Sequence, residues 1–206
     1  RFNFKGMGNK FKLVRSVWTT KVFESWAEKE SQSRLMLFLK NKGYQDAKMS
    51  SGIDESHKGE KVITFNAEKG RRYRLGKIEV SGAPDISSEE VSTLLSVDDN
   101  WFNRFLWLQA TPVLVDQEMV RLYYYQQGYP DARVTVETTF SNGKADLHFR
   151  VTPGKRVIVK TLSWQGNDHF DSRILKEQLK TRAGEPFVQH RFSEDMERLR
   201  QFYIAG

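Results

Sequence analysis

Apolar residues recur three and four positions apart in several stretches of the chain, which is the spacing that lines one face of a helix. Two such stretches are 35–39 and 120–124, and a glycine follows each, at Gly43 and Gly128. A glycine placed just after the periodic residues is typical of a helix C-terminus, because it adopts a left-handed backbone at little cost. The pattern therefore predicts two helices that end in the same way.

The residues around these glycines are repeated as well. GYQDAK begins at Gly43 and GYPDAR begins 85 residues later, at Gly128. After the second phrase, alternating apolar and polar residues flank Asn142-Gly143, and this dipeptide is a strong hairpin-turn signal. The first copy predicts the same hairpin, with a polar first arm at 48–53. Both helices therefore lead into a β-hairpin.

Each hairpin runs into a further segment that predicts a strand, at 74–80 and at 157–164. Helix-start signals follow, since Ser87 and Asp171 precede apolar residues at helical spacing and can act as N-caps. Ser193 is predicted to cap one more helix. The repeating unit is therefore strand, helix, helix, strand, strand.

Two copies of this unit are complete, and a third is cut after its second helix. The predicted fold class is α+β, built of tandem β-α-α-β-β repeat domains. Each domain is expected to be a three-stranded mixed sheet with two helices on one face. The predicted domains are 1–75, 76–159 and 160–206, and the last is the N-terminal part of a truncated third domain.

Composition removes several classes of chemistry. The chain has no cysteine, which excludes disulfides, thiol nucleophiles and thiolate metal sites. Its 4 histidines are far apart, and neither a nucleophile elbow nor a phosphate loop is present. We therefore expect no enzyme activity, no cofactor and no metal site. The 33 basic residues against 26 acidic ones are compatible with attraction to phosphates or an acidic polypeptide, and a role in solubility alone is the favoured interpretation.

A nucleic-acid module is an alternative reading of the same pattern. The strand-helix-helix-strand unit resembles a KH RNA-binding module, and Arg71, Arg72, Arg74 and Lys77 form a basic run. KH modules need Gly-x-x-Gly between their helices to clamp the RNA backbone, and neither inter-helix segment contains it. The basic run falls at the joint between repeats, where solvated charges are usual. We therefore expect no nucleic-acid partner, and a tandem KH-like module stays an alternative.

Four segments, taken in their order, resemble a known domain: LFLKNKGYQDAK, LYYYQQGYPDARVTVE, RYRLGKIEVSGA and RVIVKTLSWQGN. They are similar to the polypeptide-transport-associated (POTRA) domain, which occurs in tandem in the periplasmic arm of outer-membrane β-barrel assembly proteins of the BamA and TamA type. The resemblance implies a periplasmic scaffold for outer-membrane protein assembly, insertion or polypeptide translocation. It implies unfolded outer-membrane proteins and accessory lipoproteins as partners. It also implies attachment to the outer membrane through a C-terminal β-barrel of the same chain, absent from this fragment.

Two surfaces are candidates for binding such partners. A client strand can add to an open sheet edge by β-augmentation, through main-chain hydrogen bonds. The candidate client-binding edge consists of Arg133, Val134, Thr135, Val136, Glu137, Thr138 and Thr139. The candidate hydrophobic patch consists of Trp101, Phe102, Phe105 and Trp107, and packing beneath the main helices is the alternative role for it. A purely structural spacer that contacts no client is the alternative for the whole chain.

Overall fold

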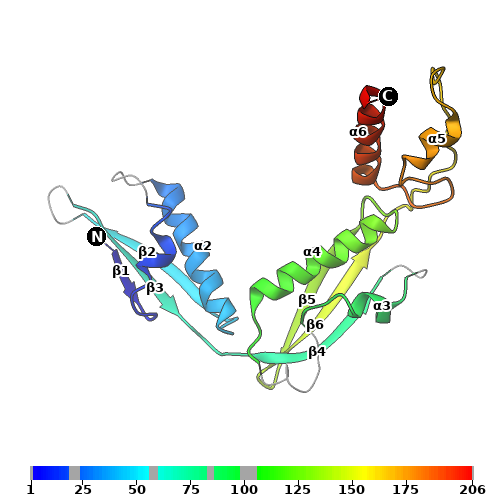
Figure 1. The fold of residues 1–206 in the computed structure, drawn as a ribbon. Coiled ribbons are helices and arrows are strands. Elements are labelled where there is room, and N and C mark those ends of the chain that lie inside the picture. Colours follow the sequence, from blue (N-terminus) through cyan, green and yellow to red (C-terminus); the bar gives the residue numbers. More distant parts are fainter. Residues whose placement is uncertain (1, 19–23, 56–59, 83–85, 98–105, 206) are drawn as a thin grey trace. The chain divides into compact units, whose positions relative to one another are not determined.

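The computed structural model describes residues 2–18, 24–55, 60–82, 86–97 and 106–205. The first repeat contains β1 (Phe2–Lys5), α1 (Phe11–Val14), α2 (Ser25–Asn41), β2 (Lys48–Asp54) and β3 (Val62–Glu68). The second contains β4 (Arg74–Ser81), α3 (Ser88–Ser92), α4 (Ala110–Gln126), β5 (Arg133–Ser141) and β6 (Lys144–Thr152). Two more helices follow, α5 (Ser172–Glu177) and α6 (Gln189–Ala205) (Figure 1). The predicted α+β fold class and the β-α-α-β-β order are confirmed.

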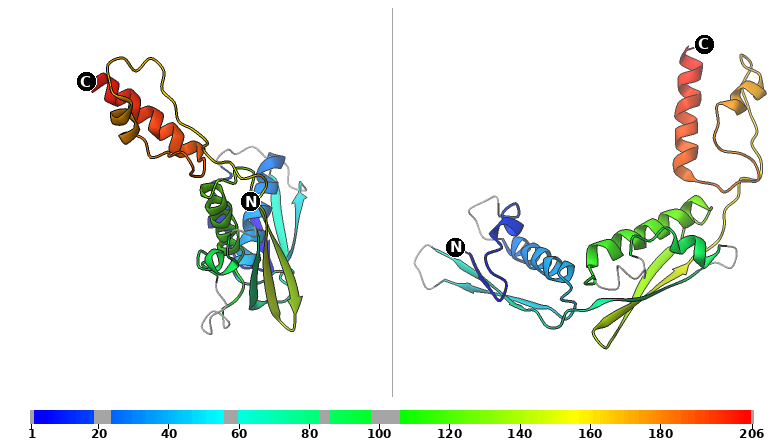
Figure 2. Two further views of the ribbon diagram at one scale, coloured as in Figure 1. Left: turned by 90° about the vertical axis from the view of Figure 1, so that its right-hand side faces the viewer. Right: turned by 60° about the horizontal axis from the view of Figure 1, so that its bottom comes forward.

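Each repeat folds its strands into one three-stranded sheet. The strand orders are β1-β3-β2 and β4-β6-β5, so the hairpin's second arm lies in the centre of each sheet. In the first sheet β1 runs parallel to β3 and β2 runs antiparallel to it, which makes the sheet mixed. The long helix α2 runs along one face of this sheet (Figures 1 and 2). The first arm of each hairpin, β2 or β5, is therefore an edge strand.

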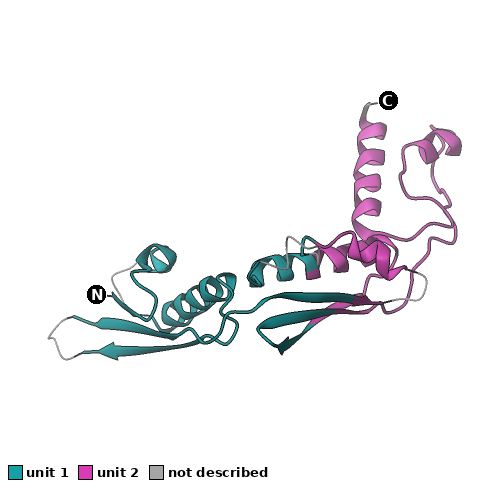
Figure 3. Ribbon diagram, turned by 90° about the horizontal axis from the view of Figure 1, so that it is seen from below, with its two compact units in different colours: residues 1–79, 96–116, 137–148 teal, residues 80–95, 117–136, 149–206 magenta. Residues whose placement is uncertain are grey.

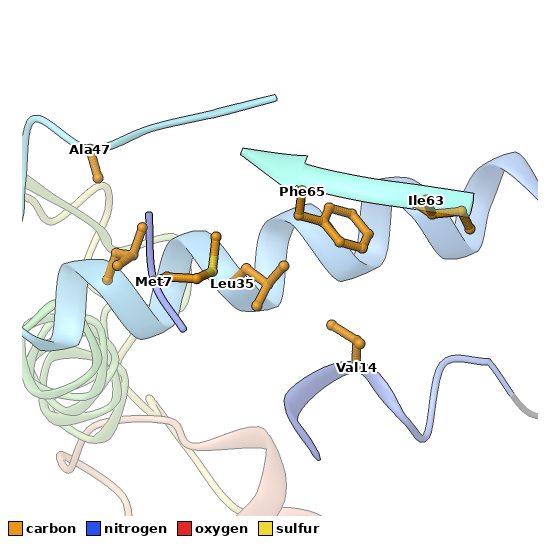
Figure 4. Close-up of a cluster of buried hydrophobic side chains, with 7 residues drawn as sticks. Met7, Val14, Leu35, Ala47, Ile63 and Phe65 are labelled. Carbon is orange, nitrogen blue, oxygen red and sulfur yellow. The ribbon is translucent and has the colours of Figure 1, made fainter. Parts of the chain in front are cut away.

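The core of the first repeat lies between α1, α2 and β3. Its buried side chains are Met7, Val14, Leu35, Leu39, Ala47, Ile63 and Phe65. Figure 4 shows Val14 of α1 directed toward Phe65 of β3, and both of these side chains are fully buried. A fully buried side chain of this size contributes about 1.5–3 kcal/mol, so these contacts fix the helices to the sheet.

The described chain packs into two compact units. The first unit comprises 1–79, 96–116 and 137–148, and the second comprises 80–95, 117–136 and 149–206 (Figure 3). The second unit has its own buried apolar side chains, among them Val91, Tyr124, Phe149 and Leu175. The domain limits at 75/76 and 159/160 stay a prediction from the sequence.

Each long helix carries one buried polar side chain at its seventh residue. These residues are Ser31 in α2, Asp116 in α4 and Asp195 in α6, and each is at most 1% exposed. A buried polar group costs free energy unless it is hydrogen-bonded. The repeated position therefore points to a repeated hydrogen-bonding task.

That task is to hold the segment that follows the short helix. The Asp116 carboxylate accepts hydrogen bonds from the backbone N–H groups of Ser96 and Val97, at 2.9 and 2.8 Å. Asp195 accepts the same pair of bonds from Lys180 and Thr181, both at 2.8 Å. In each case charge-assisted bonds satisfy N–H groups of the segment that follows the short helix.

Ser31 performs a related task in the first repeat with a neutral side chain. Its hydroxyl accepts a hydrogen bond of 2.8 Å from the indole N–H of Trp18, which follows α1. The hydrophobic pattern of the sequence did not reveal any of these three positions. Aligning the three helices at their repeated apolar residues, which begin at Leu35, Val120 and Leu199, would have revealed them.

The third copy departs from the prediction in two places. No strand forms over 157–164, and only an isolated bridge joins Ile158 to Pro186. In both complete repeats the first strand pairs with the third strand, and the described residues contain no strand after α6. Ser193 is not a cap, because α6 begins at Gln189 and the Ser193 hydroxyl donates to the Gln189 carbonyl inside the helix.

We expect Asp116→Ala to lower the free energy of unfolding by about 2–3 kcal/mol, because it removes hydrogen bonds to a buried carboxylate. Glu118→Ala on the same helix removes only an exposed ion pair with Arg121, so its expected cost is below about 1 kcal/mol. Urea unfolding at pH 7, followed by circular dichroism, measures both values. Equal losses in the two variants would contradict the role assigned to Asp116.

Acid should weaken the corresponding contact in α6. Burial raises the pKa of the Asp195 carboxyl, but hydrogen bonds from Lys180 and Thr181 outweigh this effect and leave the pKa below its usual value. The carboxylate therefore stabilises the fold above the unfolded pKa of about 3.9 and loses this effect as the pH falls through the lower folded pKa.

Amide exchange, corrected for the intrinsic effect of pH, should show protection of the Lys180 and Thr181 N–H groups falling below about pH 4. In Asp195→Asn the protection of these two groups should be low already at pH 6 and should change little on acidification. Protection that stays constant down to pH 2 in the unmodified chain would refute the contact.

Candidate functional site

The strand β5 is an edge of the sheet β4-β6-β5, as the candidate client-binding edge requires. Its side chains alternate over the first half of the strand, where Val134 is buried, Val136 is half-buried and Arg133, Thr135, Glu137 and Thr139 are exposed. The pattern changes after Val136, because Thr138 and Phe140 are also exposed. The second half of β5 therefore extends past the core.

The hairpin turn fixes which main-chain groups of β5 face outward. Asn142 and Gly143 both have positive φ, 49° and 73°, which is the type I′ geometry of a two-residue turn. Such a turn makes Ser141 and Lys144 a hydrogen-bonded pair, and every second residue of β5 then bonds to β6. The N–H and C=O groups of Val134, Val136 and Thr138 consequently face the open side.

Two side-chain hydrogen bonds agree with this register. The Thr135 hydroxyl donates to the Arg150 carbonyl on the neighbouring strand. The Gln117 amide of α4 donates to the Val134 carbonyl at 2.7 Å, on the open side of β5. One outward carbonyl is therefore already occupied, and the stretch that could accept a partner strand begins at Val136.

The other edge strand, β2, is tied to its helix by polar side chains. Ser51 lies opposite Phe65 of β3, and its hydroxyl is hydrogen-bonded to Glu28 and Gln32 of α2. This contact explains the polar sequence of the first hairpin arm, since Ser51 replaces an apolar side chain at a position that faces the helix. The stretch after Ser51 is more exposed, and Ile53 shows 39% of its surface.

The structure divides the candidate hydrophobic patch. Trp101, Phe102 and Phe105 lie outside the described residues. Trp107 is half-buried and stacks against the Arg72 guanidinium, with 3.9 Å between the guanidinium carbon and the ring centroid. Trp107 therefore belongs to the joint between repeats.

The same arginine contact occurs at both joints. Arg72 lies 5.2 Å from the Tyr44 ring centroid and its Nε donates to the Lys42 carbonyl at 2.7 Å. Arg156 lies 5.7 Å from the Tyr129 ring centroid and its Nε donates to the Gln127 carbonyl at 3.0 Å. The basic run is therefore not only a solvated charge cluster, because each arginine binds the end of the preceding helix.

Glycine is required at both joints for two reasons. Gly43 and Gly128 have φ of +89° and +91°, a region that residues with a side chain rarely adopt. A Cβ on Gly43 would lie 2.7 Å from the Trp107 Cβ, and one on Gly128 would lie 3.0 Å from the Pro186 Cβ. Trp107 and Pro186 thus have equivalent places, each shortly before the long helix of the following copy.

The described part of the chain gives little support for a metal site or a membrane-spanning helix. It contains no group of three or more His, Cys, Asp or Glu residues that could hold a metal ion. None of its helices is long and apolar enough to cross a membrane. Burial, followed by a hydrogen bond to Glu90, raises the pKa of Tyr123 to about 12. Tyr123 is thus a neutral donor at physiological pH.

A family model described as "POTRA: Surface antigen variable number repeat" matches residues 73–154 and 157–205. The outer membrane protein assembly factor BamA of Nitratidesulfovibrio vulgaris is 23% identical over 162 residues, which cover 77% of this chain and 20% of that protein. A putative outer membrane protein assembly factor of Treponema pallidum is 30% identical over 81 residues, or 39% of this chain and 10% of that protein. The chain thus spans at most about a fifth of the length of these relatives.

Solved structures show the same fold. Three consecutive domains of BamA from Haemophilus influenzae, POTRA3-5, superpose with a TM-score of 0.64 at 17% identity, covering 98% of this chain and 84% of that one. A BamA structure from Haemophilus ducreyi that lacks POTRA domains 1-3 gives a TM-score of 0.55 at 17% identity, covering 78% of this chain and 29% of that one.

The joint geometry predicts that Gly43→Ala is more harmful than Gly184→Ala. Both glycines have positive φ, but a Cβ on Gly184 meets no atom within 4 Å. Both variants should lose about 1–2 kcal/mol of stability from backbone strain, and only Gly43→Ala should also displace Trp107. Urea unfolding reports the loss of stability, and the tryptophan emission of the folded protein reports the displacement. An unchanged emission spectrum in Gly43→Ala would contradict the close contact.

Proposed function

The chain belongs to the POTRA family, and from this premise we propose that it is part of a periplasmic scaffold that receives unfolded outer-membrane proteins during their assembly. The curated relatives reported above are named as outer membrane protein assembly factors or as a putative one, and the solved BamA domains have this fold. The family assignment replaces the KH-like alternative. The role proposed for the chain is non-enzymatic, in keeping with relatives that are named as assembly factors.

One observation carries the client-binding part of the proposal: the outward main-chain groups of β5 from Val136 onward. The strand has no internal proline, is closed by a regular two-residue turn, and exposes its last residues on both faces. An added client strand would bond to N–H and C=O groups, which are the same in every client. Capture would therefore tolerate many client sequences.

The expected strength of this capture is low. The outward groups of Val136, Thr138 and Phe140 can make about six hydrogen bonds, each worth about 0.5–1.5 kcal/mol net. Ordering a client strand costs about 1–2 kcal/mol for each residue, so over about five residues the cost is as large as that gain. Weak and reversible binding follows, and this is suited to a surface that must release its client.

Two further partners belong to the proposal. A C-terminal membrane β-barrel in the full-length chain would attach the scaffold to the outer membrane, and accessory lipoproteins would dock on its domains. The similarity to BamA-type proteins supports the barrel, and the lipoproteins rest only on the resemblance described from the sequence. A spacer without client contact is the competing role. Whether clients bind at the β5 edge distinguishes the two roles.

We expect Thr138→Pro to weaken client capture strongly while the fold is retained. The Thr138 N–H faces the open side, so proline removes a binding group without breaking a bond to β6. Thr138→Ala is the matched control and should capture clients normally, because the contact is main chain. The readout is crosslinking from a photoreactive residue at exposed Thr139 to an unfolded outer-membrane β-barrel protein, and proline should lower the yield at least about fivefold.

Thr135→Pro serves as the structural control. Its N–H faces β6, so this proline should lower the free energy of unfolding by at least about 1 kcal/mol more than Thr138→Pro does. If Thr138→Pro is folded and crosslinks as strongly as the unmodified chain, β5 is not the receiving edge and the spacer role is favoured.

A further inference from the structure

Four basic side chains surround an aromatic-lined cavity of about 220 Å³ in the first repeat. They are Lys10, Lys42, Lys69 and Arg72, and the aromatic walls are Phe38 and Tyr44. The cavity takes its residues from the start of α1, the end of α2 and the segment after β3. It is separate from the β5 edge and shares no residue with it.

The cations of this cavity lie over aromatic rings. Lys10 is 5.1 Å from the Phe38 ring centroid, and Lys69 is 5.7 Å from that of Tyr44. Among the described residues no carboxylate forms an ion pair with any of the four cations. Four positive charges thus converge with no negative charge among the lining residues, which produces a local attraction for anions.

An apolar cavity adjoins the basic one. It has a volume of about 440 Å³ and shares Lys10 and Phe38 with its neighbour, and its own walls include Phe11 and Leu13. Phe11 is 38% exposed. The combined surface therefore offers an apolar half and a cationic half side by side, which fits a ligand that carries apolar and acidic groups close together.

The second repeat shows that the fold does not require this charge. At the positions equivalent to Lys42 and Lys69 it has Gln127 and Pro153, and only the joint arginine is retained as Arg156. At the position of Phe38 it has Tyr123, whose hydroxyl donates to the Glu90 carboxylate. A carboxylate thus contacts this position in the second repeat, and two of the cations are absent there.

We propose that the paired cavities of the first repeat bind an acidic segment of a partner polypeptide, with an apolar side chain against Phe11 and Phe38 and flanking carboxylates on Lys42 and Lys69. The basic cavity is smaller than the 300–1,000 Å³ typical of cofactor and drug-sized sites, which favours single side chains over a nucleotide. Its concave shape and apolar neighbour favour a peptide over a flat lipid surface.

The proposal is tested by fluorescence anisotropy with the complete 206-residue chain and a labelled peptide. The peptide contains one phenylalanine flanked on each side by two aspartates, and its control has asparagine in place of every aspartate. We expect saturable binding of the acidic peptide that weakens as salt is added, and at least about tenfold weaker binding of the asparagine peptide.

Lys42→Gln combined with Lys69→Gln should weaken binding of the acidic peptide about tenfold. Lys48→Gln is the matched control, because Lys48 is exposed on β2 of the same repeat and lines neither cavity. Its expected effect is less than about twofold. Circular dichroism should show closely similar melting curves for all three proteins, since Lys42 and Lys69 form no ion pair with a described residue and only cation–π contacts at the surface.

Three outcomes would overturn the proposal. Equal binding of the acidic and asparagine peptides would show an apolar contact alone. Equal weakening by the Lys48 variant would show a general effect of charge. Binding to vesicles of anionic phospholipid or to a single-stranded RNA, without binding of the peptide, would assign the cations to a lipid or a nucleic acid. None of these experiments depends on client capture by β5. Their outcomes are therefore independent of the function proposed above.

Discussion

The left-handed glycine after each long helix is the constraint on which the other features depend. At Gly43 and Gly128 the positive φ ends the helix and sends the chain toward the edge strand. The missing Cβ also leaves room for the following copy's Trp107 or Pro186. The carbonyl of the residue just before each glycine accepts a hydrogen bond from the Nε of the arginine that follows the hairpin. Helix end, edge strand and joint are thus positioned by one residue.

Much of this architecture could be predicted because its signals are local. Asn142-Gly143 defines a turn, Ser87 and Asp171 define helix starts, and the alternation of β5 defines its inward face. The strand predicted over 157–164 does not form, because a strand needs a neighbouring strand to pair with in addition to an alternating sequence pattern. Ser193 failed as a cap because its hydroxyl can also bond within a helix. Both misses come from contacts that sequence spacing does not encode.

The buried acceptors and the joint contacts could not be predicted from the sequence, for a related reason. Asp116 and Asp195 are charged, so a hydrophobic pattern places them on the solvent side. The basic run predicts a solvated charge at Arg72, whereas Arg72 binds Lys42 and Trp107, which are far away in the sequence. Comparing the repeats with each other recovers part of this information. Features that both copies share, such as the joint arginine, belong to the fold, and Lys42 and Lys69 are specific to one copy.

The hydrogen bond from Gln117 to the Val134 carbonyl has a consequence for the length of any strand that adds to β5. Under the proposed function, an added strand would pair from the hairpin tip only as far as Val136, a span of about five residues and ~17 Å. A long unfolded chain would therefore touch this edge through one short segment at a time.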